Sequence, residues 1–464
     1  MKLSTPFKRV HFVGIGGIGM SAIAAMMVDL GFRVQGSDIS DGPNIARLRK
    51  LGIPVIVGHQ AQNITGADAV VVSTATPMDN PEVIEAKKRG IPVGHRSEML
   101  AEILRYKQGI CISGTHGKTT TSSLIASILI AGKKKPSFII GGVLNAHKSN
   151  AQLGRGPAVV VEADESDGSF LRLPATVSVV TNIDPEHMDF YHTFDAMKEA
   201  YKTFIRNTAF YGFSVVCVDH PVVRDIISDI KDKKIITYGF DKKADVHADN
   251  IRVGLGKLTF DAFVRQGDKF HKIKDVVLNQ FGRHNIQNAL AAIAVGKQMG
   301  IADSAIHKAL KTFQGIQRRL TLRGYVENVP VYDDYAHHPV EIEATLRALR
   351  AGSKGRIIAV FQPHRYTRLR DLWDDFLNCF SQADAVFVCD VYGAGEKAIP
   401  AVCAEQFVKE LQARHPQAAY MPGFEALPHL MRQTIRPGDT IVCLGAGSIS
   451  AQSAALAAPV KGKK

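Results

Sequence analysis

Cysteine is sparse in the sequence, and its spacing argues against domains that are stabilised by zinc or by disulfide bonds. The 464 residues include six cysteines, and no two of them have the spacing of a metal-binding or redox motif. A zinc module or a disulfide scaffold is therefore not expected. Most of the cysteines lie in or beside apolar runs, so we expect reduced core residues in a cytoplasmic protein. They are Cys111, Cys217, Cys379, Cys389, Cys403 and Cys443.

Long apolar runs and basic tracts mixed with aromatic residues are also missing. A fairly apolar stretch, residues 1–30, has His11 and four glycines at its centre. A signal peptide or membrane-spanning helix has no need of such glycines, so we expect no targeting segment and no membrane insertion. The net charge of +13 is spread along the chain. It suits anionic small molecules such as nucleotides, and we expect no nucleic-acid partner.

The regular pattern that is present is an alternation of short apolar runs with helical stretches. This alternation predicts parallel β-sheets connected by crossover helices. Continuous apolar strands such as "PAVVVEAD" and "VSVVTNI" indicate sheets that are covered on both faces. The pattern restarts near residues 107 and 319. The sequence therefore predicts an α/β protein of three domains, which would span residues 1–107, 108–318 and 319–464.

A first glycine-rich loop, "GIGGIGMS", spans residues 14–21. Gly14, Gly16 and Gly19 fit G-x-G-x-x-G between a strand and a helix, where a pyrophosphate can approach the backbone and the helix N-terminus. Asp38 follows about twenty residues later, where an acid often contacts a ribose hydroxyl. Taken alone, this loop favours an NAD-dependent dehydrogenase. Any nucleoside diphosphate could use the same geometry.

A second loop, "SGTHGKTTTSS", spans residues 113–123 and is two residues shorter than the usual G-x-x-x-x-G-K-[ST] phosphate loop. It also lies between a predicted strand and a predicted helix. Lys118 would reach the β- and γ-phosphates of a nucleotide, and the Thr119 hydroxyl would bind Mg²⁺. The alternative is a chance Gly-Lys-Thr at a helix start, because Thr is a good N-cap.

Acidic and histidine residues follow two further predicted strands. "EADESD" places Glu162 directly after a strand, where a carboxylate beside a phosphate loop is a natural Mg²⁺ ligand. We expect Asp164, Glu165 and Asp167 to form a solvated turn. His187 in "NIDPEHMD" could orient a phosphate or bind a metal, and its alternative is a structural role.

Two other groups of residues could bind parts of a substrate. Asn285 and Asn288 lie one helical turn apart, and their amides suit an adenine edge or, alternatively, helix capping. Arg365 and Arg368 could clamp a carboxylate with forked hydrogen bonds. Their alternative is a solvated basic face.

Taken together, these motifs resemble those of the Mur ligases, the ATP-dependent amino-acid ligases of peptidoglycan precursor synthesis. The motifs, in chain order, are "GTHGKTTT", "EADESD", "NIDPEHMD", "GRHNIQNA", "GIQRRL", "DDYAHHP" and "FQPHRYTRLRD". The resemblance covers essentially the whole chain. It implies a Rossmann-like domain for a UDP-sugar, a central P-loop-type ATPase domain and a C-terminal Rossmann-like domain.

The resemblance also implies a reaction. ATP and Mg²⁺ would drive the joining of L-alanine to the carboxylate of UDP-N-acetylmuramate, in a cytoplasmic monomer or weak dimer. A related ligase that joins a whole tripeptide to the same sugar nucleotide is the second candidate. A dehydrogenase and a non-catalytic nucleotide-binding protein are the rivals from other classes.

The resemblance further implies roles for individual residues. Lys118, Glu162 and His187 would be catalytic, and Thr119, Glu162 and His187 would hold metal. ATP would contact Gly114, Thr115, Gly117, Lys118, Thr119, Thr120, Asn285, Asn288, Arg319 and Asp334. The sugar nucleotide would contact Gly14, Gly16, Gly17, Gly19, Ser37, Asp38, His59, Ser73, Arg96 and His116. L-alanine would contact Tyr335, His337, Arg365 and Arg368. Tyr201 aligns near a lysine that is carbamylated in several Mur ligases, so no carbamylation is predicted here.

Overall fold

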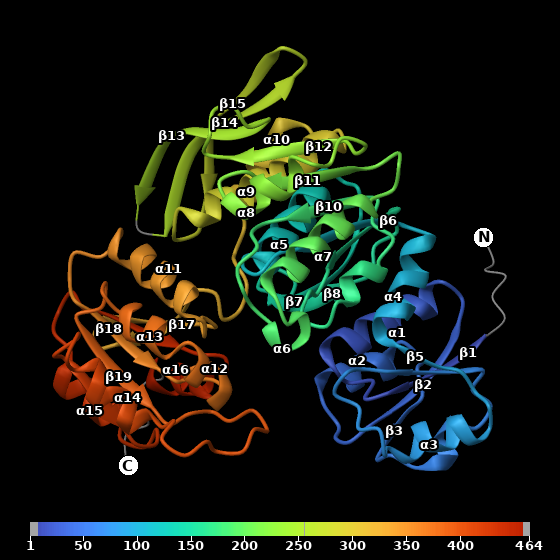
Figure 1. The fold of residues 1–464 in the computed structure, drawn as a ribbon, viewed down its shortest axis with the longest axis horizontal. Coiled ribbons are helices and arrows are strands. Elements are labelled where there is room, and N and C mark those ends of the chain that lie inside the picture. Colours follow the sequence, from blue (N-terminus) through green and yellow to red (C-terminus); the bar gives the residue numbers. More distant parts are fainter. Residues whose placement is uncertain (1–7, 255, 458–464) are drawn as a thin grey trace. The chain divides into compact units, whose positions relative to one another are not determined.

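The computed structural model describes residues 8–254 and 256–457. It shows three β-sheets, of five, ten and six strands, with helices between the strands along the chain (Figure 1). The predicted α/β class with mostly parallel sheets is confirmed. The outermost residues of the first and last predicted domains lie outside the described residues. None of the described helices combines the length and apolarity needed to cross a bilayer.

The chain packs as two compact units, and the division passes through strands of the ten-stranded sheet. The predicted boundaries of three domains therefore remain predictions. The first unit comprises residues 1–249, 262–274 and 287–313, and the second comprises 250–261, 275–286 and 314–464.

The first sheet is parallel and has the strand order β3-β2-β1-β4-β5. Its order reverses at β1, because the chain adds β2 on one side of β1 and β4 on the other. Ligands of such sheets bind outside the carboxyl ends of the strands at this reversal. The strands are β1 (Arg9–Val13), β2 (Arg33–Asp38), β3 (Val55–Val57), β4 (Ala69–Val72) and β5 (Val93–His95). The helices are α1 (Ile18–Asp29), α2 (Pro43–Lys50), η1 (Ala61–Ile64), α3 (Pro81–Lys88) and α4 (Arg96–Arg105).

The second sheet has the order β15-β14-β13-β12-β11-β10-β6-β9-β7-β8. β6 runs parallel to both β9 and β10, so the loops that follow these three strands meet at one edge. The strands are β6 (Gln108–Ser113), β7 (Ser137–Leu144), β8 (Ser149–Gln152), β9 (Ala158–Glu162), β10 (Val177–Val180), β11 (Phe213–Cys217), β12 (Ile235–Gly239), β13 (Val246–Gly254), β14 (Lys257–Gln266) and β15 (Lys269–Leu278). The helices are α5 (Lys118–Ala131), η2 (Ser169–Arg172), α6 (Met188–Tyr191), α7 (Phe194–Arg206), α8 (Pro221–Ile227), α9 (His284–Gln298) and α10 (Asp303–Lys311).

The third sheet has the order β16-β17-β21-β18-β19-β20, and only its first pair is antiparallel. Its central strands are buried on both faces, as their continuous apolar sequences predict. The strands are β16 (Thr321–Val326), β17 (Val329–Asp334), β18 (Ile357–Phe361), β19 (Ala385–Cys389), β20 (Ala418–Met421) and β21 (Thr440–Leu444). The helices are α11 (Pro339–Arg350), α12 (Tyr366–Asp371), α13 (Trp373–Asn378), α14 (Ala404–Leu411), α15 (Leu427–Thr434) and α16 (Ile449–Ala457).

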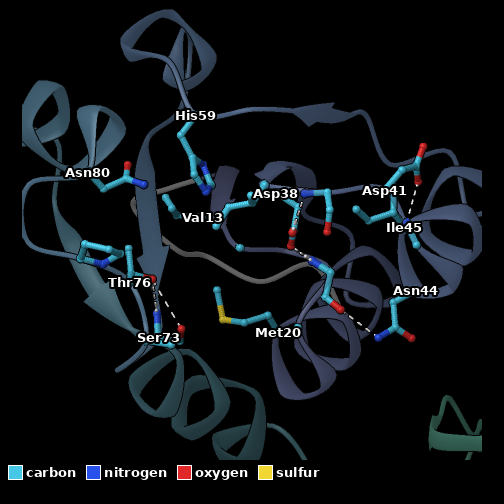
Figure 2. Close-up of a pocket in the computed structure, with 18 of the residues that line it drawn as sticks. Val13, Met20, Asp38, Asp41, Asn44, Ile45, His59, Ser73, Thr76 and Asn80 are labelled. Atoms are coloured by element: carbon cyan, nitrogen blue, oxygen red, sulfur yellow. Dashed lines mark hydrogen bonds between the residues drawn. The ribbon is translucent and has the colours of Figure 1, made fainter. Parts of the chain in front are cut away.

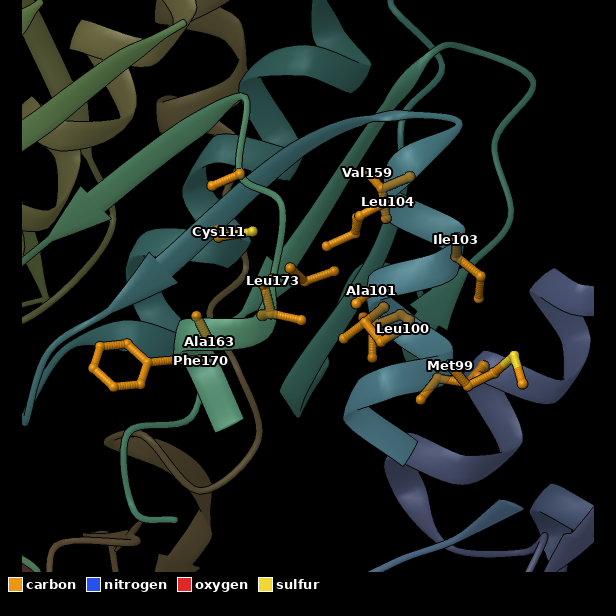
Figure 3. Close-up of a cluster of buried hydrophobic side chains, with 14 of the residues drawn as sticks. Met99, Leu100, Ala101, Ile103, Leu104, Cys111, Val159, Ala163, Phe170 and Leu173 are labelled. Atoms are coloured by element: carbon orange, nitrogen blue, oxygen red, sulfur yellow. The ribbon is translucent and has the colours of Figure 1, made fainter. Parts of the chain in front are cut away.

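One hydrophobic core connects the first sheet to the second within the first unit (Figure 3). Met99, Leu100 and Leu104 on α4 belong to the same buried cluster as Val159 of β9 and Phe170 of η2. Protein interiors are close-packed, so a continuous apolar core couples the elements that contribute side chains to it. The two glycine-rich loops therefore belong to the same compact unit.

The cysteines are all free, as expected, but they are not all in the core. Five are buried, whereas Cys403 is exposed. The Cys403 sulfur accepts a hydrogen bond from the Gln406 amide at 3.5 Å and thereby caps α14. The expectation of a core position was wrong for this residue, because its local apolar neighbours belong to the start of a surface helix.

Candidate functional site

The first glycine-rich loop packs tightly against the end of β2. Gly14 has a φ of +74°, which only glycine adopts without strain. The Gly16 amide donates to Asp38 Oδ2 at 2.8 Å. A Cβ atom on Gly16 would lie 2.9 Å from the same oxygen. The loop therefore has no room for a side chain at this position.

A cavity of about 430 Å³ opens beside this loop (Figure 2). Six of the residues predicted to bind the sugar nucleotide line it, namely Gly14, Gly16, Gly17, Asp38, His59 and Ser73. The other wall, whose residues were not predicted, includes Met20, Asn44, Thr76 and Asn80. Met20 lies on α1, Asn44 lies on α2, Asn80 is the N-cap of α3 and Thr76 lies in the loop after β4, and of these only Met20 falls within a recognised motif.

The other residues predicted for the sugar nucleotide lie elsewhere. Ser37 is fully buried below the cavity wall. A Cβ atom on Gly19 would lie 3.2 Å from Arg96 Nη1, so Arg96 covers the start of α1. Arg96 Nη2 also lies 3.8 Å from Asp164 Oδ2 on the loop after β9. Arg96 thus stands between the first glycine-rich loop and the acidic loop.

The second glycine-rich loop joins β6 to α5 and has two glycines in the left-handed region. Gly114 has a φ of +134° and Gly117 has a φ of +83°. A Cβ atom on Gly114 would lie 2.0 Å from Thr181 Oγ1, and one on Gly117 would lie 2.8 Å from Asn288 Oδ1. Gly117 is the N-cap of α5 and has no side chain to cap it. The amides of this helix start are thus available to an anion such as a phosphate.

Lys118 curls back over this loop. Its Nζ donates to Gly114 O at 2.6 Å, to Thr115 O at 3.2 Å and to Glu165 Oε1 at 2.7 Å. Burial alone would lower the pKa of Lys118, but the adjacent Glu165 carboxylate outweighs it and raises that pKa, so the amine keeps its charge. The lysine is held by a carboxylate and two loop carbonyls in this structure, and its contact with a phosphate remains a prediction.

Glu165 corrects an expectation from the sequence. It is 1% exposed, so it does not belong to a solvated turn. Burial raises the pKa of Glu165 to about 7, although Lys118 opposes the shift. Sequence reasoning missed it because neither its neighbours nor its spacing reveals that η2 and α6 cover this loop.

Thr119 and Glu162 lie together, as the metal prediction requires. Thr119 Oγ1 donates to Glu162 Oε2 at 3.3 Å. The Gly141 amide donates to Glu162 Oε1 at 2.7 Å. A hydroxyl and a carboxylate at the edge of a phosphate loop are hard oxygen donors, which suit Mg²⁺.

His187 lies in a second cluster of ligand types. Its side chain, Glu165 and Glu186 each offer an atom, and these atoms all lie within 4.8 Å of one another. His187 has a φ of +57°, an uncommon conformation for a non-glycine residue and one often found at functional sites. Glu186 was not predicted, although it directly precedes His187 in the same motif.

His116 is fixed by the loop after β10. Its amide donates to Asn182 Oδ1 at 2.7 Å, and its carbonyl accepts from Thr181 Oγ1 at 2.7 Å. Its Nε2 lies 3.7 Å from Asp184 Oδ2. His116 is therefore part of the second loop and is not among the residues that line the first cavity.

The two asparagines of α9 both make structural hydrogen bonds. Asn288 Oδ1 accepts from Thr121 Oγ1 at 3.1 Å, beside the second loop. In the other unit, Asn285 Nδ2 donates to Phe281 O at 2.7 Å. A contact with adenine remains a prediction for both.

In the second unit, the ends of β17 and β18 bring a further group together. The Tyr335 and His337 rings lie 5.1 Å apart, and His337 and His364 lie 5.7 Å apart. Arg368 Nη1 lies 3.1 Å from His364 Nδ1. Arg365 has a φ of +70° and lies 4.0 Å from Glu396. The four residues predicted to bind L-alanine thus occupy one edge of the third sheet.

Sequence reasoning missed His364, although it stands inside the "QPHRYTR" motif. Burial lowers the pKa of His364 to about 4, so its ring is neutral near pH 7. Nearby, Asp334 accepts from the amides of Leu320 and Ala336 at 2.7 and 2.8 Å, and burial raises its pKa to about 6. Arg319 Nη1 lies 3.7 Å from Glu341 Oε1.

Comparison with known proteins places three family matches along the chain. Residues 9–108 match "Mur ligase family, catalytic domain", residues 112–296 match "Mur ligase middle domain", and residues 318–447 match "Mur ligase, glutamate ligase domain". The three matches together span most of the described chain.

Whole-length relatives agree with these matches. A UDP-N-acetylmuramate–L-alanine ligase from Parvibaculum lavamentivorans is 52% identical over 95% of this chain and 90% of its own length. One from Bradyrhizobium sp. (strain ORS 278) is 50% identical over 98% of both chains. The crystal structure of the UDP-N-acetylmuramate-alanine ligase MurC from Thermotoga maritima has a TM-score of 0.79 at 28% identity, over 97% of this chain and 98% of that one.

Proposed function

The chain belongs to the Mur ligase family, and from this premise we propose that it joins L-alanine to the carboxylate of UDP-N-acetylmuramate. ATP would be cleaved to ADP and phosphate, and the product would serve peptidoglycan precursor synthesis. The names of the relatives at about 50% identity support this choice over the ligase that uses a tripeptide. We further propose that the enzyme acts in the cytoplasm as a monomer or weak dimer.

The observation that carries the proposal is the presence of two separate glycine-rich loops, each between a strand and a helix, in one compact unit. The first loop borders the 430 Å³ cavity, and the second presents Lys118 and the amides of α5. A dehydrogenase would need only the first. A ligase of a sugar nucleotide needs both, one for the UDP pyrophosphate and one for ATP.

The first chemical step activates the muramoyl carboxylate, which is otherwise a poor electrophile. One carboxylate oxygen attacks the γ-phosphorus of ATP, the bond to the β-phosphate oxygen breaks, and ADP leaves. Lys118 would contact the transferred phosphate and offset its charge. Its hydrogen bond to Glu165 must then be replaced by hydrogen bonds to phosphate oxygens, because the carboxylate and the phosphate compete for the same ammonium group.

The second step forms the amide. The neutral amine of L-alanine attacks the acyl carbon, and the tetrahedral intermediate releases inorganic phosphate with the former carboxylate oxygen. Arg365 and Arg368 would hold the L-alanine carboxylate, since guanidinium groups bind carboxylates in forked geometry. The methyl group alone gives limited selection, about 1–3 kcal/mol per methylene, so slow use of glycine or serine is expected.

We propose Mg²⁺ as the metal, held by Thr119 and Glu162 in one place and by His187 with Glu165 and Glu186 in another. The donors fit, since four of the five offer oxygen. When bound, the ions would neutralise charge on the phosphate oxygens. The protein's own contribution is to fix these side chains, as the Gly141 amide does for Glu162.

A phosphate-release assay tests the proposal. ATP and UDP-N-acetylmuramate are held constant, and the acceptor is absent, L-alanine, glycine or L-alanyl-γ-D-glutamyl-diaminopimelate. We expect release that needs both the sugar nucleotide and L-alanine. Release with the tripeptide instead would assign the recycling reaction, and no release together with NAD binding would favour a dehydrogenase.

A further inference from the structure

A buried carboxylate lies directly beneath the cavity of the first glycine-rich loop. Glu82, in the first turn of α3, is 0% exposed. Its Oε2 accepts from Ser37 Oγ at 2.6 Å and lies 3.3 Å from both His11 Nε2 and His59 Nδ1. Its Oε1 accepts from Asn63 Nδ2 at 2.5 Å. The carboxylate therefore connects β1, β2, the loop after β3 and η1 beside the cavity.

Glu82 is ionised at neutral pH. Burial alone would raise its pKa, but hydrogen bonds from His11, Ser37 and Asn63 outweigh burial and lower the pKa to about 2. The N-terminal end of α3 adds a favourable dipole. Each oxygen of Glu82 can thus only accept hydrogen bonds.

The surroundings of His59 then determine where its ring carries a proton. His59 Nδ1 lies 3.0 Å from Ser37 Oγ and 3.3 Å from Glu82 Oε2. The single Ser37 hydroxyl proton is donated to Glu82. Both neighbours of Nδ1 therefore act as acceptors, and Nδ1 must be the protonated nitrogen.

The opposite nitrogen faces different surroundings. His59 lines the cavity, and among residues 8–254 and 256–457 no hydrogen bond engages its Nε2. In a neutral ring with the proton on Nδ1, Nε2 has a free lone pair and is a hydrogen-bond acceptor. Figure 2 shows the His59 side chain extending toward the cavity from the loop after β3.

We propose that Glu82 is a positioning residue, which keeps the His59 Nε2 atom as an acceptor for an N–H or O–H group of the bound nucleoside. The donor is either the imide N–H of the uracil or a ribose hydroxyl. This inference rests on the proposed function, because it takes the nucleoside of UDP-N-acetylmuramate as the occupant of the cavity. It adds a reason for nucleoside recognition that the glycine-rich loop alone does not supply.

The test is the variant Glu82→Gln, which keeps the shape of the side chain but lets an amide donate to His59 Nδ1. The proton then moves to Nε2, which becomes a donor. We expect the KM for UDP-N-acetylmuramate to rise about three- to tenfold, the worth of one hydrogen bond, with kcat and the KM for ATP within about twofold. Glu85→Gln is the matched control, because it lies one turn along α3 in an ion pair with Arg89 on the surface.

A double-mutant comparison separates positioning from a structural role. His59→Ala removes the acceptor and should raise the same KM by a similar factor. In the His59→Ala background, Glu82→Gln should then have no further effect, because it acts through His59. An equal effect of Glu82→Gln with and without His59, or a KM unchanged in both, would overturn the inference.

A second measurement uses the wild-type protein and therefore does not depend on how the variants fold. UDP, 3-methyl-UDP and 2′-deoxy-UDP are compared as competitors of UDP-N-acetylmuramate. Weaker competition by the 3-methyl compound identifies the uracil N–H as the donor, and weaker competition by the deoxy compound identifies the ribose. Either loss should vanish in His59→Ala, and a loss that persists there contradicts the inference. Failure of the proposed function is distinguishable, because the wild type would then not bind UDP-N-acetylmuramate at all.

Discussion

At the residue scale, Lys118 has a structural contact in this structure and a different contact in the proposed reaction. It pairs with the buried Glu165 and two loop carbonyls. Removing one member of a buried ion pair leaves the other without compensation. A substitution at Lys118 must therefore be tested for folding as well as for activity.

Lys118→Ala should lower kcat/KM for ATP by about a hundredfold or more, because a preorganised positive charge at the transferred phosphate is lost. Phosphate release measures this effect, and circular dichroism checks the fold. Lys198→Ala is the control, since that lysine pairs with the exposed Asp195 and lies over the Phe194 ring, both on α7 and outside the second loop. Near-normal ATP turnover by a folded Lys118→Ala protein would refute the assignment of the loop.

A pH dependence of stability follows from Glu82. Its pKa in the folded protein, about 2, is below the ordinary value of 4.5. The folded state thus binds fewer protons, and its stabilisation is present above pH 4.5 and is lost as the pH falls toward 2. Between pH 6 and 3 the wild type should lose on the order of 2 kcal/mol more than Glu82→Gln, with allowance for solvent screening.

Urea denaturation at several pH values measures this difference. The Glu85→Gln protein should follow the wild type over the same range. Parallel pH curves for the wild type and Glu82→Gln would show that Glu82 is not held as an ionised, hydrogen-bonded group.

Motif residues could be predicted from the sequence, and buried charges could not. Gly114, Gly117 and Lys118 are recognisable because the phosphate-binding geometry itself demands their types and order. Glu82 and Glu165 have ordinary surroundings in the sequence. Their burial results from helices and loops that fold over them, so only tertiary structure reveals them.

At the element scale, the second loop depends on the backbone freedom of its first glycine. Gly114→Ala would place a Cβ atom 2.0 Å from Thr181 Oγ1 at a φ of +134°. The loop must shift, so we expect loss of ATP binding. Gly300 also has a positive φ, +72°, but a Cβ atom added there would meet no atom within 4 Å, so Gly300→Ala is the control. It should cost about 1–2 kcal/mol of stability and leave the KM for ATP unchanged.

Isothermal titration with a non-hydrolysable ATP analogue, together with thermal unfolding, compares these two variants. A Gly114→Ala affinity for the ATP analogue equal to that of the wild type would mean that strain at Gly114 does not matter for binding. Equal losses of affinity in both variants, relative to the wild type, would mean that the effect is one of general stability.

Most elements were predictable because their apolar periods are clear, and the exceptions have physical reasons. Strands β7 and β8 were not predicted, since the run "FIIGGVL" contains two glycines and strand propensity is weak there. Strand β16 runs antiparallel to β17, whereas the other neighbouring strands of the third sheet run parallel to one another. Its pairing depends on a tight turn to β17, and the pattern of apolar residues did not indicate it.

At the scale of the whole molecule, the proposed reaction requires two nucleotide sites that bind different ligands. Amide hydrogen exchange should show protection of residues 14–21 and 38–45 with UDP-N-acetylmuramate alone. An ATP analogue alone should protect residues 113–122. Residues 257–266 in β14 serve as the internal control. Protection of the first loop by the ATP analogue, and of the second by the sugar nucleotide, would reverse the assignment.

The most direct test of the central claim, activation of the muramoyl carboxylate by ATP, follows oxygen atoms. UDP-N-acetylmuramate labelled with ¹⁸O in its carboxylate is incubated with ATP, L-alanine and the enzyme, and mass spectrometry is applied to both products. We expect UDP-N-acetylmuramoyl-L-alanine and inorganic phosphate that carries one ¹⁸O atom, since the carboxylate oxygen leaves with the phosphate. Unlabelled phosphate, or ATP cleavage without the amide product, would contradict it.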